Sequence, residues 1–84
     1  MITLRNYIGG TFSAPANGRY LDNIEPATGE VYSLIPDSGA EDVARAVEAA
    51  KKAYPTWSAL TAADRSKHLL AVAQRIEERM DELA

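Results

Sequence analysis

The spacing of apolar residues changes once along this chain, close to Pro36 and Asp37. Before that point, short β-rich runs alternate with turns that contain glycine or proline, which is typical of β-strands. After it, apolar residues recur every three or four positions, which is typical of amphipathic helices. The 84 residues therefore predict a single α+β unit. Residues 1–37 are expected to form two β-hairpins, and residues 38–84 to form two helices.

The first predicted hairpin surrounds a pair of glycines. Residues 6–8 and 11–13 flank Gly9-Gly10, a two-residue loop that can adopt the positive φ angles of a primed turn. The second predicted hairpin joins residues 20–25 to residues 31–35. In its turn, Pro26 presets φ and Gly29 supplies a left-handed position.

Both faces of residues 31–35 are mostly apolar. Val31, Ser33 and Ile35 point one way, whereas Tyr32 and Leu34 point the other way. This pattern predicts a strand that is covered on both sides. No combination of the other predicted elements in these 84 residues is expected to cover both faces of this strand.

The first helix is expected to begin at Ser38, because Ser38 and Glu41 have the spacing of a capping box. Asp42 adds negative charge to the first turn, where the helix dipole favours it. Pro55 is expected to end this helix. Its apolar stripe comprises Val43, Ala46, Val47, Ala50 and Tyr54.

The second helix is expected to begin at Thr61, with Asp64 as the acidic residue of its first turn. It carries one long apolar stripe that continues to the last residues. Asp81 and Glu82 place negative charge where a helix C-terminus disfavours it. We therefore expect an incomplete helix that belongs to a longer polypeptide. The stripe comprises Leu69, Val72, Ala73, Ile76, Met80 and Leu83.

Composition excludes several classes of function. The chain has no cysteine, so it holds no disulfide, no thiolate metal site and no cysteine nucleophile. Its net charge of −3 argues against partners such as nucleic acids or acidic lipid surfaces. No run approaches the roughly 18–20 apolar residues of a membrane span, and no apolar targeting segment is present. We expect a cytoplasmic protein.

The one candidate for acid–base chemistry is the pair Asp64 and His68, which lie four residues apart on one helix face. In a small enzyme, Asp64 would orient the imidazole of His68 as a general base. The alternative is a solvated pair on the helix surface, and no nucleophile accompanies it.

The other polar groups also favour structural roles. Glu77-Glu78 and Asp81-Glu82 resemble a solvated helix face more than a metal site. Lys51-Lys52 and the pair Arg65 and Lys67 alternate with acids, and the glycines fit no phosphate-binding pattern. Trp57 is expected to fill a corner between helices. We therefore predict no catalytic, cofactor-binding or metal-binding residue within residues 1–84.

Several short segments stand in a characteristic order along the chain. They are Tyr7-Ile8-Gly9-Gly10-x-Phe12, the turn Glu25-Pro26-Ala27-Thr28-Gly29-Glu30, Ala40-Glu41-Asp42-Val43, Ala46-Val47-x-Ala49-Ala50, Trp57-Ser58, and residues 65–84. In this order they resemble the N-terminal region of NAD(P)-dependent aldehyde dehydrogenases, whose turn segment is Asn-Pro-Ala-Thr-Gly-Glu. This chain has glutamate in place of the usual asparagine.

The resemblance implies a longer parent enzyme, of which this chain is an N-terminal part of the cofactor-binding domain. In that family a cysteine thiolate attacks the aldehyde, hydride passes to NAD or NADP, and a glutamate activates water. Residues 19–22, 31–36 and Tyr54 are similar to the branch that acts on muconic semialdehydes. The implied parent is a homodimer or homotetramer, and the 84 residues alone are expected to be inactive.

Some family members bind a monovalent cation through backbone carbonyls at positions that Asn23 and Ile24 match. The remaining ligands come from other segments, so no metal site is predicted here. The alternative to a scaffold segment is a stand-alone interaction module, which would bind a partner through residues 31–35 or through the Leu69–Leu83 stripe.

Overall fold

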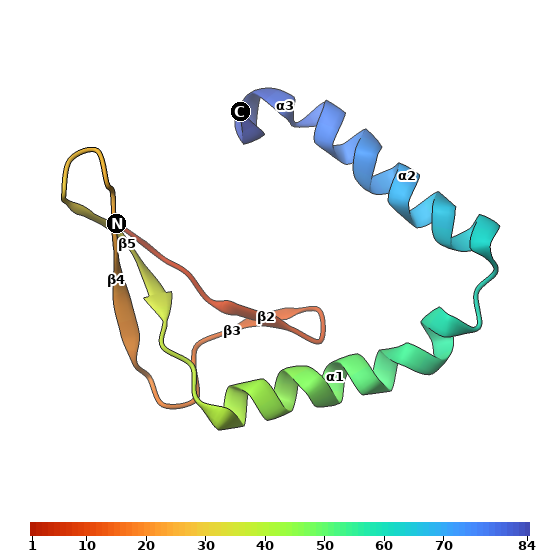
Figure 1. The fold of residues 1–84 in the computed structure, drawn as a ribbon, viewed down its shortest axis with the longest axis horizontal. Coiled ribbons are helices and arrows are strands. Elements are labelled where there is room, and N and C mark those ends of the chain that lie inside the picture. The colour runs from red at the N-terminus through yellow and green to blue at the C-terminus, as the bar shows by residue number, and fades with distance from the viewer. The chain divides into compact units, whose positions relative to one another are not determined.

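A computed structural model describes residues 1–84, and the contacts within it divide them into two units, residues 1–52 and residues 53–84 (Figure 1). Five strands lie in the first unit, and α1 crosses the boundary. The elements are β1 (Ile2–Thr3), β2 (Asn6–Ile8), β3 (Thr11–Ser13), β4 (Tyr20–Ile24), β5 (Val31–Pro36), α1 (Ala40–Ser58), α2 (Ala62–Glu78) and α3 (Met80–Leu83). The α+β prediction, with two hairpins before the helices, is confirmed.

The first hairpin joins β2 and β3 in antiparallel register, with Tyr7 opposite Phe12. The two rings meet edge to face at 4.8 Å between centroids. Gly9 and Gly10 have φ angles of 60° and 84°, which are the positive values that a primed two-residue turn requires. The predicted turn chemistry is therefore confirmed.

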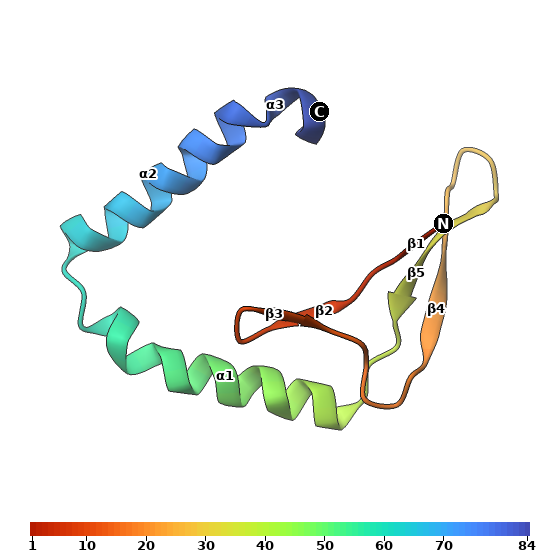
Figure 2. The same cartoon turned by 180° about the vertical axis from the view of Figure 1, so that it is seen from behind.

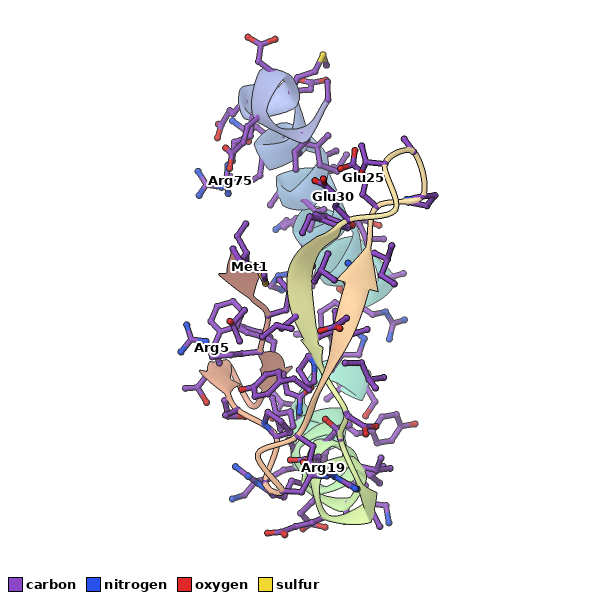
Figure 3. The ribbon with its side chains drawn as sticks, turned by 90° about the vertical axis from the view of Figure 1, so that its left-hand side faces the viewer. Met1, Arg5, Arg19, Glu25, Glu30 and Arg75 are labelled. Atoms are coloured by element: carbon purple, nitrogen blue, oxygen red, sulfur yellow. The ribbon has the colours of Figure 1, made fainter.

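The second hairpin joins β4 and β5, also in antiparallel register. The backbone N–H of Glu25 donates to the carbonyl of Glu30 at 2.8 Å, and Gly29 has a φ of 77°. Figure 3 shows Glu25 and Glu30 close together at the base of this turn. The left-handed position predicted for Gly29 is confirmed, and a register shift at Asn23 and Ile24 bends the end of the ladder.

A third strand, β1, was not predicted. It pairs in parallel with β5, placing Ile2 opposite Ser33, so that β5 becomes the central strand of the order β1-β5-β4 (Figure 2). Ser33 is 4% exposed but Tyr32 remains 54% exposed. The cover on both sides that was expected for residues 31–35 is therefore not reached within residues 1–84.

The start of α1 differs from the prediction, because Ser38 is not its N-cap. The helix begins at Ala40, and Gly39 occupies the cap position, where its carbonyl accepts from the N–H of Val43 at 3.3 Å. The hydroxyl of Ser38 instead accepts from the side-chain amide of Asn6 at 2.8 Å. The hydroxyl oxygen of Ser38, which would accept a helix N–H in a capping box, therefore accepts from Asn6 instead.

The predicted end of α1 at Pro55 is also wrong, because the helix continues to Ser58. A proline removes only its own N–H donor, whereas its carbonyl still accepts hydrogen bonds. The carbonyl of Pro55 accepts from the N–H of Ala59 and from the hydroxyl of Ser58, each at 3.3 Å. The final turn therefore forms after the proline.

Thr61 caps α2 as predicted, its hydroxyl accepting from the N–H of Asp64 at 3.1 Å. The continuous second helix is not observed, since α2 ends at Glu78 and Arg79 (φ −117°, ψ 25°) separates it from α3. The side chains of the stripe remain between 51% and 69% exposed at the positions Leu69, Val72, Ile76, Met80 and Leu83. No helix combines the length and the apolar run needed to cross a bilayer.

Candidate functional site

The most buried polar residue in the first unit is Asp42, which is 3% exposed. Its carboxylate accepts from the backbone N–H of Ala16 at 3.0 and 3.2 Å and from that of Gly39 at 3.4 Å. Ala16 belongs to a turn closed by the Gly18 N–H and the Pro15 carbonyl at 2.9 Å. Asp42 therefore fastens a turn between strands to the first turn of α1.

A second set of bonds supports the same junction. The side-chain amide of Asn17 donates to the carbonyl of Asp37 at 3.0 Å, and the N–H of Asp37 donates to the carbonyl of Arg19 at 2.9 Å. The polar groups around Asp42 are thus satisfied within the fold, and no nucleophile lies among them. The arrangement is suited to positioning the backbone, not to acid–base chemistry.

A cavity of about 250 Å³ opens beside this junction. Its polar lining comes from Asp42 and from Asn6 and Ser38, which are hydrogen-bonded to each other. Apolar atoms dominate the remainder. The lining residues are Asn6, Tyr7, Ile8, Ser38, Asp42, Val43 and Ala46.

The Asp64–His68 pair does not form. The carboxylate of Asp64 lies 3.8 Å from the ammonium of Lys67, and no hydrogen bond joins it to the imidazole. The ring of His68 instead lies 5.3 Å from the indole of Trp57, at an interplanar angle of 55°. The general-base arrangement is therefore absent. Trp57 lies at the corner between the helices, but it is 44% exposed and does not fill that corner as a core residue.

The acidic residues near the end of the chain form pairs one helical turn apart. Arg75 contacts Glu78 at 3.2 Å, and Nε of Arg79 donates to Glu82 at 2.8 Å. The hydrogen bond to Glu82 raises the pKa of Arg79 above its ordinary value. No cluster of three or more histidine or carboxylate side chains has the geometry to hold a metal ion.

Of the basic residues that were expected to pair with acids on the helix surface, only Lys67 does so, whereas the glycines are accounted for by local structure. Lys67 belongs to the exposed pair with Asp64. No ion pair is formed by Lys51, Lys52 or Arg65. The glycines at positions 9, 10 and 29 lie in hairpin turns, where their positive φ angles explain the residue type.

A shallow groove of about 490 Å³ runs along α2 and α3 in the second unit. Its floor is apolar, and two arginines that are already paired with glutamates form its rim. The lining residues are His68, Ala71, Val72, Arg75, Ile76, Arg79 and Leu83.

Neither long helix offers a site for the phosphates of a dinucleotide. The N-terminal N–H groups of a helix bind phosphate when they are free and face a neutral or positive surrounding. At α1 the carboxylate of Asp42 occupies that position, and at α2 the hydroxyl of Thr61 and the charge of Asp64 occupy it. The N-termini of α1 and α2 are therefore not free to bind the phosphates of a dinucleotide.

The role of Asp42 as a fastening group was missed at the level of sequence. The available signal was its position three residues after the cap, where an acidic side chain can reach back to the cap N–H. Its second partner, Ala16, lies 26 residues away and has no signature, because a backbone N–H is common to every residue except proline.

Comparison with known proteins places the chain among enzymes of one family. A family model described as "Aldehyde dehydrogenase family" matches residues 12–84. The 2-aminomuconic semialdehyde dehydrogenase of Danio rerio is 53% identical over 81 residues, which is 96% of this chain and 16% of the relative. The enzyme of the same name from Mus musculus is 44% identical over 84 residues, which is all of this chain and 17% of the relative.

A solved structure shows the same fold. The crystal structure of PnpE in complex with nicotinamide adenine dinucleotide is 44% identical in sequence and superposes with a TM-score of 0.89. The match covers 95% of this chain and 16% of that one. The chain thus spans about one sixth of the length of the proteins it resembles.

Proposed function

The chain belongs to the aldehyde dehydrogenase family, and we propose that it is an N-terminal scaffold segment of an enzyme that oxidises an aldehyde to a carboxylic acid with NAD or NADP. The observation that supports this proposal is that the match covers nearly all of this chain but only a small part of the relative. The match extends over 96% of this chain but over 16% of the Danio rerio relative. A segment that matches one region so completely has the fold of that region, which supports the scaffold role.

The residue types of this chain indicate which tasks of the parent enzyme it could perform. The family reaction needs an activated thiolate nucleophile, and this chain has no cysteine. Both helix N-termini are occupied by side chains of the chain itself. We therefore propose that none of residues 1–84 is catalytic, and that none of them binds the cofactor or a metal. Their contribution is to support the cofactor-binding domain.

The substrate and the assembly are proposed from the relatives. The Danio rerio and Mus musculus enzymes are named for 2-aminomuconic semialdehyde, which supports a conjugated semialdehyde acid as the substrate of the parent enzyme. We propose the remainder of the parent polypeptide as the first partner, a homodimer or homotetramer as the assembly, and the cytoplasm as the location. A nucleic-acid or membrane partner is not part of the proposal.

A chimera tests the scaffold role. These 84 residues replace the matching segment of the Danio rerio enzyme, and NAD-dependent oxidation of its semialdehyde is measured. We expect the chimera to fold and to retain activity within a few fold of the parent. The matched control carries Asp42→Ala in the same chimera, which removes the fastening carboxylate while leaving every catalytic residue of the recipient in place. An inactive chimera that is nevertheless folded and binds NAD would contradict the proposal.

The alternative of a stand-alone interaction module makes a different prediction for the isolated chain. A module would form a discrete and stable oligomer at several concentrations in sedimentation experiments. A scaffold segment would remain a loosely packed monomer or aggregate, because its apolar stripe is exposed.

A further inference from the structure

Asn17 differs from the other asparagines of the chain because a glycine, Gly18, follows it. The other two, Asn6 and Asn23, precede a tyrosine and an isoleucine. An asparagine deamidates when the backbone nitrogen of the next residue attacks its side-chain carbonyl carbon, and a bulky side chain on that next residue hinders the attack. Glycine has no side chain to hinder it. Asn17 and Gly18 are both exposed, so water reaches the reacting atoms.

The reaction requires two nitrogen atoms to be free. The nitrogen of Gly18 forms a bond to Cγ of Asn17, and the bond between Cγ and Nδ2 breaks. The proton of the Gly18 N–H leaves with Nδ2 as ammonia. Water then opens the resulting imide ring at either carbonyl carbon, which gives aspartate or isoaspartate without any oxidation or reduction.

The fold holds both of these nitrogen atoms in hydrogen bonds. The N–H of Gly18 donates to the carbonyl of Pro15 at 2.9 Å. Nδ2 of Asn17 donates to the carbonyl of Asp37 at 3.0 Å, and Oδ1 of Asn17 accepts from the N–H of Arg19 at 2.9 Å. The attacking nitrogen and the departing nitrogen therefore become free only when these bonds open.

The same bonds belong to the junction that fastens residues 15–19 to residues 37–42. The buried carboxylate of Asp42 accepts from the N–H of Ala16, the residue directly before Asn17. Local opening of a junction frees all the groups that it holds, and its frequency depends on the strength of the bonds that close it. The bond between Ala16 and Asp42 thus also restrains the side chain of Asn17.

We propose that Asn17-Gly18 is a site of spontaneous deamidation that the junction with residues 37–42 suppresses, so that the modification occurs when the junction opens. Aspartate at position 17 cannot donate to the carbonyl of Asp37, and isoaspartate routes the backbone of the turn through its side chain. Either product adds a negative charge to a junction that already holds the carboxylate of Asp42. Deamidation therefore weakens the junction whose opening permits it.

Mass spectrometry of the 84-residue chain tests the suppression. The chain and a peptide of residues 13–21 are incubated in the same buffer near neutral pH, and conversion of Asn17 is followed after digestion. We expect Asn17 to deamidate at least about 5-fold more slowly in the chain than in the peptide, because two hydrogen bonds must open first. Asn6 and Asn23 are internal controls and are expected to remain unmodified. A smaller difference, or a peptide that does not deamidate, would overturn the proposal.

Substitution of the fastening carboxylate tests whether the junction causes the suppression. Asp42→Ala is expected to accelerate deamidation of Asn17 in the chain by at least about 3-fold, and Asp42→Asn by an intermediate factor. Glu41→Gln, at an exposed neighbour, should leave the rate unchanged. Circular dichroism monitors folding, and if Asp42→Ala loses its secondary structure the comparison rests on Asp42→Asn. An unchanged rate, or an equal increase in Glu41→Gln, would overturn the proposal.

The modified chain tests the effect on the junction. After separation by ion exchange, the deamidated chain is expected to unfold at a lower urea concentration than the unmodified chain, and equal midpoints would contradict the proposed weakening. None of these measurements depends on catalysis, so failure of the proposed function leaves them intact.

Discussion

The carboxylate of Asp42 accepts the backbone N–H of Ala16 through both of its oxygens, at 3.0 and 3.2 Å. This link joins the turn before β4 to the first turn of α1, and its carboxylate is among the most buried polar groups of the chain. A buried charge is tolerated when it is fully hydrogen-bonded, and its loss leaves donors without partners. Asp42 therefore links two distant segments of the first unit through a buried carboxylate.

Replacing Asp42 by alanine is expected to destabilise the first unit by about 1–3 kcal/mol, because the backbone N–H groups of Ala16 and Gly39 lose the acceptor that the buried carboxylate provides. Asp42→Asn keeps one acceptor oxygen and should lower the free energy of unfolding by less than Asp42→Ala does. Urea unfolding followed by circular dichroism measures the difference. The matched control is Glu41→Gln, an exposed neighbour on the same turn, which should change stability by less than about 0.5 kcal/mol. Equal losses at positions 41 and 42 would contradict the assigned role.

The turn between β4 and β5 is expected to be sensitive to backbone strain at Gly29. Its φ is 77°, and a Cβ built there meets no atom within 4 Å. The strain is thus conformational, and Gly29→Ala is expected to lower stability by about 1–2 kcal/mol. Gly29→Asn should lower stability by less than Gly29→Ala does, since asparagine adopts left-handed backbone angles more readily than alanine. Thermal unfolding of both variants checks the order, and a greater loss with asparagine would count against this explanation.

Pro55 lies inside α1, where it leaves the carbonyl of Lys51 without its helical donor. Pro55→Ala restores that N–H and is expected to raise helix content and to stabilise the last turns of α1 by up to about 3 kcal/mol. Circular dichroism at the helical minimum and urea unfolding measure both effects. Ala50→Pro introduces a proline into the middle of the same helix and serves as the control. It should destabilise α1 by about as much as Pro55→Ala stabilises it. Loss of helix in Pro55→Ala would refute the prediction.

The exposed apolar stripe on α2 and α3 predicts that a substitution at Ile76 has different effects on the stability of this chain and of the longer enzyme. Ile76 is 51% exposed in this chain, so Ile76→Asp should change its stability little or improve its solubility. In the longer enzyme proposed above, the same change would bury an unpaired charge and destabilise severely. Thermal unfolding in both contexts checks this, with Gln74→Asp as the control for added charge. A large and equal loss in both contexts would show that residues 1–84 already cover Ile76.

Local patterns predicted most of the elements. The two hairpins form where turn residues demand positive φ, as at Gly9 and Gly10. The cap of α2 forms because Thr61 and Asp64 are three residues apart and need no distant partner. The errors at Ser38 and Pro55 have different origins. The hydroxyl of Ser38 binds the amide of Asn6, which is 32 residues away and therefore invisible to a local rule. The helix continues past Pro55 because the proline carbonyl still accepts from the next turn, a local bond that the rule left out.

The sequence by itself determined the two hairpins and their turns, the two long helices, the family resemblance and the absence of a cysteine nucleophile, because each depends on residue types at short spacing. Only the tertiary structure decided that β1 pairs in parallel with β5, that Asp42 binds Ala16, and that His68 contacts Trp57 and not Asp64. These contacts join residues separated by 11 positions or more along the chain, and most of them use backbone groups that every residue possesses. Residue patterns carry little information about such pairs, since closing the chain between them is decided by the packing of whole elements.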